Sequence, residues 1–401
     1  MLDEVFTTLD CLQRRKTQPL DTALSFAHVN HGEPAVCALS AAHQCKAKYA
    51  FAFASCFMRA AQDHRPRTAI LLQFTGIGDL IWHIHYFRLI AARSHNGQVT
   101  IVAQPSTLAR GFIGHEPWVE EIIDHDHRPR RGEGRKGQHA GLRGMQRMAS
   151  QLRQRQFDRI ILFSGRASRG LVAWLSGIPT RMGFGYRWLQ RIFLSQGPYI
   201  PAYTGQSVAA FHEASAFMVA HGFCAAPIPP RLEVPAAFVA QMQTRLSHLQ
   251  RPWYALAIGT SEVHKQWGAA NFAELAKRLI EERGGSVILL GGPGETTLAQ
   301  EIKSAIPPAL HPHVAIVTDA PPLGSAAVLQ LADACIGNDT GMTNVAAAVQ
   351  TPSYALLGER PPLEHDPVYL HNIRAKRLTD ITAAHVMSHL PHLSAGVAAS
   401  R

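Results

Sequence analysis

Residues 336–348, IGNDTGMTNVAAA, carry the clearest indication of fold class in this chain. They follow and overlap an apolar run, 329–336, that predicts the end of a helix and then a short strand. The small residues from Gly341 onward predict a helix that begins as soon as the chain has turned. A buried strand that turns directly into a helix is the repeating unit of an α/β protein.

Three residues at this turn suit the binding of phosphate. Asp339 and Thr340 stand where residues that cap a helix N-terminus belong, and Gly341 lets a ligand approach the backbone. The start of a helix offers free N–H groups and a partial positive charge, which attract phosphate oxygens. Ordinary capped helices look the same, so this motif alone leaves both interpretations open.

Length and composition indicate a globular protein of two domains. The chain has 401 residues, of which 46% are hydrophobic and 17% charged. No apolar run approaches the ~18 residues of a membrane span, and no secretory signal is visible near Met1. The six cysteines show neither a C-x-x-C pair nor a zinc-binding spacing. That usage is typical of a reducing cytoplasm.

Positive charge is concentrated in residues 128–155. The formal net charge of the chain is +10, and this stretch holds nine basic residues against the single acid Glu133. A solvated loop and helix face would explain it, as would attraction to an anionic lipid head group, an acidic sugar or nucleic acid. The stretch contains no aromatic residue, which disfavours single-stranded nucleic acid because bases need rings on which to stack.

Two series of strands and helices follow an N-terminal extension of helical composition, residues 1–65. In the first half we expect strands at 68–74, 99–103, 119–123 and 159–163, and a helix at 77–93. In the second half we expect strands at 254–258, 286–290, 314–317 and 353–357, and helices at 269–283, 296–305, 325–331 and 381–390. Continuous apolar strands separated by helices indicate parallel sheets covered on both faces. The Pro-rich residues 227–231 mark a boundary, so we expect domains at 66–228 and 229–401 with a ligand site between them.

Residues 74–80, FTGIGDL, supply the first supporting motif, at the carboxyl end of the first strand. Gly76 and Gly78 permit a tight turn, and Asp79 follows in the first turn of the helix. A carboxylate there can act as general base for a hydroxyl, or it can simply favour the positive end of the helix. Ile81 stands where a dinucleotide fingerprint has its third glycine, which disfavours a nicotinamide dehydrogenase.

Residues 258–267, IGTSEVHKQW, occupy the same place in the second half. Thr260 and Ser261 can donate hydroxyl hydrogen bonds to phosphate, and Lys265 supplies a point charge, although it could also be an exposed loop lysine. A Gly-rich turn at 291–294 then leads to Glu295, which can accept hydrogen bonds from a ribose or merely occupy a helix start.

These segments, in this order, resemble the family 9 glycosyltransferases, the ADP-heptose heptosyltransferases of lipopolysaccharide core assembly. The resemblance covers residues 67–390 and is carried above all by Asp339-Thr340-Gly341, with the small-residue helix and Pro352 behind it. It implies an α/β protein of the GT-B fold, with an acceptor-binding first half and a donor-binding second half. It also implies inverting transfer from a nucleotide-diphosphate sugar, with no cofactor and no catalytic metal.

The resemblance gives each candidate residue a role. Asp79 matches the base that takes the proton of the acceptor hydroxyl, and Lys265 matches the lysine that stabilises the leaving diphosphate. The donor-binding candidates are Thr260, Ser261, Glu295, Asp339, Thr340, Gly341 and Asn344. On the acceptor side we place Gly76, Gly78, Arg128, Arg130 and Arg131. Asn344 departs from the histidine that the family often has there, which leaves the donor sugar open, and residues 358–362 match the family only loosely.

We therefore expect a cytoplasmic enzyme that moves heptose or a related sugar from an ADP-sugar to an anionic glycolipid or a polypeptide. Peripheral contact with the inner face of the cytoplasmic membrane is expected, and a nucleic-acid partner is not. Two alternatives stay open: a GT-B transferase or epimerase that uses a UDP-sugar, and a silent nucleotide-sugar-binding scaffold that docks through residues 1–65.

Three His-x-His pairs are candidates for metal binding: His83/His85, His125/His127 and His311/His313. Residues i and i+2 of a helix point to different faces, which makes the first pair a poor chelate. The second pair has no cysteine or acid in the pattern of a known metal site. We expect scattered surface histidines instead.

Overall fold

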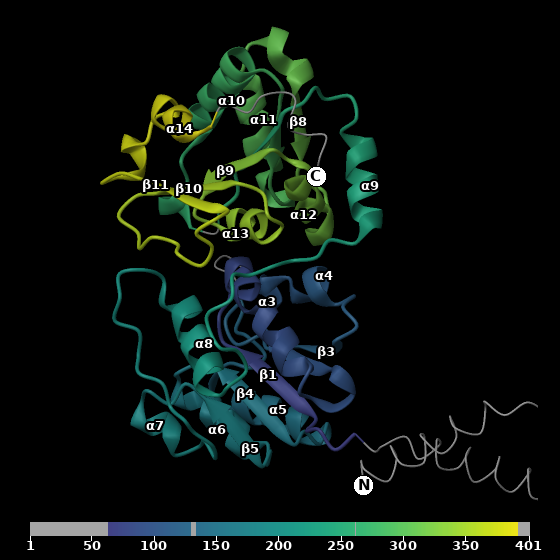
Figure 1. Cartoon of the computed structure of the whole chain (residues 1–401), viewed down its shortest axis with the longest axis vertical. Coiled ribbons are helices and arrows are strands. Elements are labelled where there is room, and N and C mark those ends of the chain that lie inside the picture. Colours follow the sequence, from purple (N-terminus) through teal and green to yellow (C-terminus); the bar gives the residue numbers. More distant parts are fainter. Residues whose placement is uncertain (1–62, 130–133, 261, 392–401) are drawn as a thin grey trace, which may run out of the picture. The chain divides into compact units, whose positions relative to one another are not determined.

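The computed structural model describes residues 63–391, with gaps at 130–133 and 261 (Figure 1). The expected helical extension falls almost entirely outside the described residues. So do three of the candidate site residues, Ser261, Arg130 and Arg131.

The first sheet has five parallel strands in the spatial order β3-β2-β1-β4-β5. Its strands are β1 (Thr68–Leu72), β2 (Val99–Ala103), β3 (Val119–Asp124), β4 (Arg159–Phe163) and β5 (Thr180–Gly183). The helices of this half are α3 (Ile77–Ala91), α4 (Ala109–Ile113), α5 (Gly141–Gln154), α6 (Ala167–Leu175), α7 (Trp188–Arg191) and α8 (Ala209–Ala220).

The second sheet has six parallel strands in the order β11-β10-β9-β6-β7-β8. Its strands are β6 (Trp253–Ala257), β7 (Ser286–Leu290), β8 (Val314–Val317), β9 (Ala334–Asn338), β10 (Ser353–Leu357) and β11 (Leu370–Arg374). The helices are α9 (Ala236–Arg245), α10 (Ala269–Arg283), α11 (Thr296–Ala305), α12 (Pro322–Leu331), α13 (Gly341–Ala348) and α14 (Ala383–His389).

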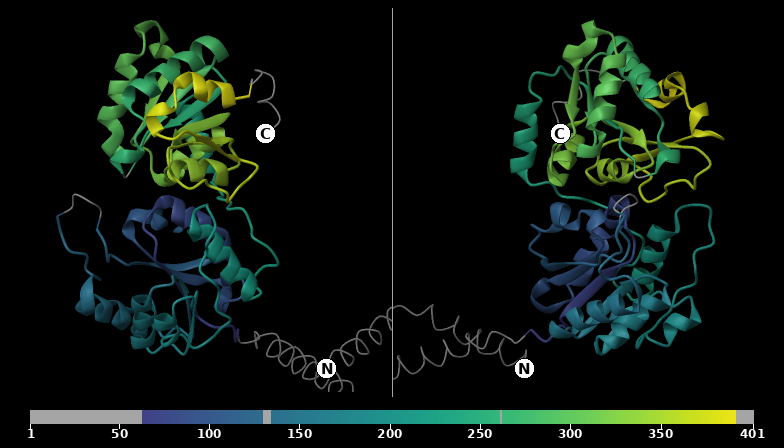
Figure 2. Two further views of the ribbon diagram at one scale, coloured as in Figure 1. Left: turned by 90° about the vertical axis from the view of Figure 1, so that its left-hand side faces the viewer. Right: turned by 180° about the vertical axis from the view of Figure 1, so that it is seen from behind.

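Helices cover both faces of each sheet, as the views in Figures 1 and 2 show. Every residue of the central strands β1, β2, β6, β7, β9 and β10 is buried. Strands buried on both faces need apolar side chains on both, which explains their continuous apolar sequences. The expectation of two parallel α/β sheets is therefore confirmed.

Two strands depart from expectation. β5 (TRMG) has four residues, and β11 (LHNIR) has polar residues between its two buried apolar ones, so neither presents a continuous apolar run. The helices α4 to α9 are likewise not marked by a motif in the sequence. All strands of the first sheet lie within 66–228 and all strands of the second within 229–401, while the boundary itself stays a prediction.

The order of the strands fixes where ligands bind. It reverses between β1 and β4 in the first sheet and between β6 and β9 in the second. Open α/β sheets bind ligands beyond the carboxyl ends of the strands at such a switch point. Asp79 follows β1, Lys265 follows β6 and Asp339 follows β9, so all three candidates lie at these positions.

Helices α3 and α13 pack closely where both of them begin. A Cβ atom on Gly78 would lie 2.9 Å from Nδ2 of Asn344, and one on Gly341 would collide with Ile77. Trp82 Nε1 on α3 donates a hydrogen bond of 2.9 Å to Oδ1 of Asn344 on α13. The glycines therefore permit an approach of two helix starts that side chains would block.

Candidate active site

Asp79 lies in the first turn of α3, where its position fits both of the roles considered for it. Its Oδ2 accepts a 2.9 Å hydrogen bond from the backbone N–H of Gly76, so the carboxylate caps the helix. Burial raises the pKa of Asp79 to about 6, while the charge of Lys265 lowers it and that of Asp339 raises it. The three candidates therefore act on one another electrostatically, and Asp79 has a pKa suited to a base near neutral pH.

Asp339 is the centre of a small ion-pair network. Its Oδ2 lies 3.7 Å from Nζ of Lys265 and 2.7 Å from Nε of Arg360. Lys265 also lies 3.6 Å from a carboxylate oxygen of Glu262. The side chains of Lys265 and Asp339 are 13% and 11% exposed, so their charges are poorly screened and still reachable by a ligand.

A cavity of 540 Å³ opens at this network. It is lined by His264, Lys265, Asp339, Leu356, Gly358, Glu359, Arg360, Lys376, Arg377 and Leu378. Four cationic side chains face two carboxylates, which suits a ligand with several negative charges, such as a diphosphate. The loops after β10 and β11 supply Arg360, Lys376 and Arg377, which sequence motifs do not identify. The loosely matched loop at 358–362 was the one signal for Arg360.

The side chains of Thr260 and Glu295 form hydrogen bonds with the backbone of the turns in which they lie. Thr260 Oγ1 accepts from the N–H of Glu262 and donates to its carbonyl oxygen. Glu295 Oε2 accepts a 2.7 Å hydrogen bond from the N–H of Gly292, so the helix-start alternative describes it well. Neither residue lines the 540 Å³ cavity, and their expected donor contacts stay predictions.

The start of α13 is also partly occupied by protein contacts. Thr340 is the N-cap residue, but its side chain makes no capping hydrogen bond. A Cβ on Gly341 would collide with Ile77 of α3, so its lack of a side chain serves helix packing, while its expected contact with the donor stays a prediction. Asn344 is buried and donates a 2.7 Å hydrogen bond to the carbonyl of Thr340 while it accepts one from Trp82. Its amide thus contacts both helices, and its expected contact with the donor stays a prediction.

The expectation of scattered surface histidines is wrong for His125, which lies at the carboxyl end of β3 in the first sheet. His125, directly after β3, is 1% exposed, and its ring stacks on that of His127 with centroids 4.6 Å apart. His139 is buried beside them, with a centroid distance of 5.9 Å to His125. Burial lowers the pKa of all three, so they are neutral at pH 7. Among the described residues, no three His, Cys, Asp or Glu side chains group so that they could hold a metal ion.

Arg169 on α6 lies beside these histidines, and no acid in the described part of the chain pairs with it. It is 5% exposed, its buried Nε has no hydrogen-bond partner there, and burial lowers its pKa to about 10. Its charge lowers the pKa of His125 and His127, and Arg128 also acts on His127. Arg128, one of the expected acceptor-side arginines, is exposed and lies close to His127. A buried, unpaired guanidinium is costly unless an anion joins it.

Comparison with known proteins gives one consistent result. Residues 145–386 match the family model for glycosyltransferase family 9 (heptosyltransferase). The lipopolysaccharide heptosyltransferase 2 of Escherichia coli (strain K12) is 25% identical over 316 residues, which are 77% of this chain and 87% of the relative.

Solved structures show the same fold. The ADP-heptose lipopolysaccharide heptosyltransferase II of E. coli superposes with a TM-score of 0.61 at 20% identity and covers 80% of this chain and 96% of its own. A family 9 glycosyl transferase from Veillonella parvula DSM 2008 superposes with a TM-score of 0.64 at 19% identity, covering 81% and 96%. The expected GT-B architecture is therefore confirmed.

Proposed function

Because the chain belongs to glycosyltransferase family 9, the heptosyltransferases, we propose that it transfers heptose from ADP-heptose to a hydroxyl of an anionic glycolipid. The observation that supports this most directly is the electrostatic grouping of Asp79 with Lys265 and Asp339 beside a cationic cavity. This grouping supports the proposal because glycosyl transfer requires a base near the acceptor hydroxyl and cationic groups near the leaving diphosphate.

The reaction follows from these charges. The Asp79 carboxylate takes the proton of the acceptor hydroxyl as its oxygen attacks the anomeric carbon of the sugar. The bond from that carbon to the diphosphate breaks on the opposite side, which inverts the configuration. Lys265 and Arg360 then stabilise the charge that develops on the leaving diphosphate. No step in this scheme needs a metal ion, and we propose that none takes part.

The donor proposal rests on the family and on the charge of the cavity. The curated relative is a lipopolysaccharide heptosyltransferase, and the superposed E. coli enzyme is named for ADP-heptose. Lys265, Arg360, Lys376 and Arg377 would hold the diphosphate of such a donor. Asp339, which forms ion pairs with Arg360 and Lys265, would accept hydrogen bonds from hydroxyls of the sugar.

The acceptor proposal rests on Arg169. This buried guanidinium lies on α6, which begins four residues beyond the carboxyl end of β4, the neighbour of the strand that precedes Asp79. A carboxylate or phosphate on the acceptor would supply the anion that Arg169 lacks, while the neutral His125 and His127 could donate hydrogen bonds to it. We therefore favour an acidic or phosphorylated glycolipid over a polypeptide, at the cytoplasmic face of the membrane.

A donor panel combined with an Asp79 variant tests this function. Purified protein should bind ADP with higher affinity than UDP or GDP in calorimetry, and should release ADP from ADP-heptose when a phosphorylated glycolipid is present. Asp79→Asn should lower turnover by about 10²–10⁴-fold, as expected for loss of a general base, and leave ADP affinity unchanged. Preference for UDP would replace the donor, wild-type turnover in the variant would remove Asp79 as base, and binding without any turnover would favour a scaffold.

A further inference from the structure

Large apolar side chains gather on the surface of the first domain around α6 and α7. Five of the nine such side chains that are exposed in the described residues lie in the segment 174–199. Four of them form what we call the α6–α7 surface: Trp174 (52% exposed), Trp188 (68%), Leu189 (48%) and Ile192 (60%). Exposed apolar clusters of this kind usually mark a binding surface.

These side chains form one surface because α6 and α7 pack on each other. The ring of Trp174 lies 6.3 Å from that of Phe193, the residue after Ile192. Trp188 and Ile192 are four residues apart, which places them on the same side of the helical turn at α7. A hollow of 430 Å³ lies beside them, lined by Tyr186, Arg187, Trp188, Leu189 and Arg191.

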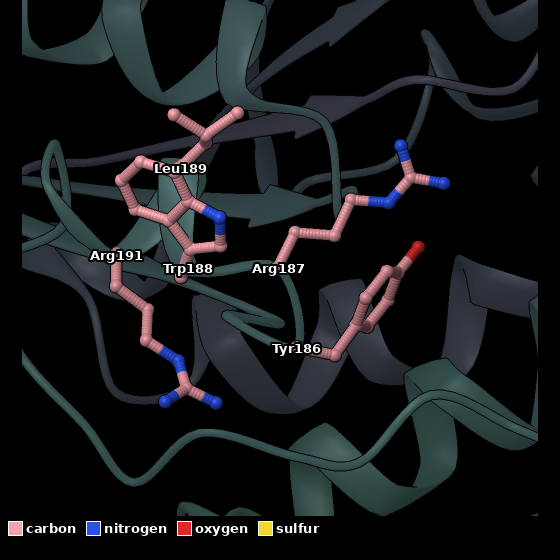
Figure 3. Close-up of a pocket in the computed structure, with 5 residues that line it drawn as sticks. All are labelled: Tyr186, Arg187, Trp188, Leu189 and Arg191. Carbon is pink, nitrogen blue, oxygen red and sulfur yellow. The ribbon is translucent and has the colours of Figure 1, made fainter.

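The segment of sequence that carries this surface is basic. Residues 159–212 contain six arginines and no Asp or Glu. Figure 3 shows Trp188 and Leu189 directed to one side of the hollow and Arg187 to the other, with the Tyr186 hydroxyl near it. Arg187 acts electrostatically on Glu213 of α8, a buried acid outside this segment whose pKa is raised by burial.

We propose that the α6–α7 surface docks this protein on an anionic membrane. Indole and aliphatic side chains partition into the boundary between head groups and acyl chains, while Arg187 and Arg191 remain at the level of the lipid phosphates. In the described part of the chain, no helix is long and apolar enough to cross a membrane. The docking surface follows directly on β4 and β5, the strands next to the proposed acceptor anion site, which would bring a lipid-linked acceptor to Asp79.

Vesicle sedimentation with the full-length protein tests the proposal without any substrate, so it can fail while transfer activity stands. Only the idea that docking brings a lipid-linked acceptor to Asp79 rests on the proposed function. We expect binding to vesicles that contain phosphatidylglycerol and little binding to pure phosphatidylcholine. The double variant Trp188→Ser/Leu189→Ser should bind at least about tenfold more weakly, because the apolar anchors are lost. Both side chains are exposed, so its melting temperature should equal that of the wild type.

Two controls separate this surface from other features of the chain. Leu142→Ser removes an even more exposed side chain (73%) from α5 and should leave binding unchanged. Arg143→Gln/Arg147→Gln removes charge from the basic stretch of the same helix. The proposal is overturned if the wild type does not sediment with anionic vesicles, if Trp188→Ser/Leu189→Ser binds as well as the wild type, or if neutral vesicles bind equally well.

Discussion

The pH dependence of transfer should show how Lys265 and Asp339, which lie outside α3, act on the pKa of Asp79. Burial raises the pKa of Asp79 to about 6, Lys265 lowers it and Asp339 raises it. A base acts only when it is ionised, so the rate should fall as the pH drops through this value. One unit below it, about a tenth of the sites carry an ionised base, so the rate should be about tenfold below its plateau.

Variants of the cavity should move this acidic limb in opposite directions. Lys265→Gln removes a cation that favours the carboxylate, so the limb should move to higher pH. Asp339→Asn removes a repelling anion, so the limb should move to lower pH, each time by about 0.5–1 unit. Lys376→Gln is the matched control: it removes a cation from the same cavity, but one that does not act on the pKa of Asp79.

Release of ADP, followed with both substrates far below their KM values, reports the ionisation of the free enzyme. The position of the limb is separate from the height of the plateau, so a weaker diphosphate site in Lys265→Gln does not disturb the comparison. If the limb stays at one pH in the wild type and all three variants, the titrating group is not Asp79. A phosphate or carboxylate of the acceptor itself would give that result.

Three further changes probe single residues of the site. The raised pKa means that folded Asp79 holds its proton between pH 3.8 and about 6 while the unfolded chain loses it, so stability falls as pH rises through that window. Asp79→Asn should therefore raise the free energy of unfolding at pH 7 by about 1–3 kcal/mol and make no difference below pH 3.8, and equal thermal melts at pH 7 would contradict this. Arg360→Gln should weaken ADP binding about tenfold in calorimetry, since it removes a charge-assisted contact, and unchanged affinity would take Arg360 out of the donor site. Arg169→Gln should raise the KM of an anionic acceptor about tenfold without changing that of the donor, and an equal effect on both would point to a structural role instead.

The fold was largely predictable because its central strands are buried on both faces. The bounds expected for 99–103, 159–163, 286–290, 314–317 and 353–357 are those of β2, β4, β7, β8 and β10. Most strands and helices of the second half were expected, since its helices α10 and α11 also carry clear periodic patterns. β11 escapes prediction because it is an edge strand with two buried apolar residues, so a local pattern is absent.

The site was predictable where its residues follow strands and hidden where they depend on packing. Asp79 lies in the segment after β1 of the first sheet, while Lys265 and Asp339 lie in the segments after β6 and β9. These two are neighbouring parallel strands of the second sheet, so their carboxyl ends meet at one edge. Arg360 reaches Asp339 from a loop after β10, and only the folded loop reveals that contact. Arg169 carries no signal at all, since burial of a charged side chain without a partner is a property of tertiary packing.

Asn344 shows how a departure from the family pattern can concern the scaffold. Its amide has both an acceptor and a donor, and it uses them on Trp82 of α3 and on the carbonyl of Thr340. Trp82 Nε1 also lies 3.2 Å from Nε2 of His365, an imidazole that burial keeps neutral by lowering its pKa to about 3. The start of α3 carries Asp79, and Asp339 immediately precedes the start of α13. We infer that Asn344 helps to set the distance between Asp79 and Asp339. The identity of residue 344 therefore bears more directly on the contact between α3 and α13 than on the choice of sugar.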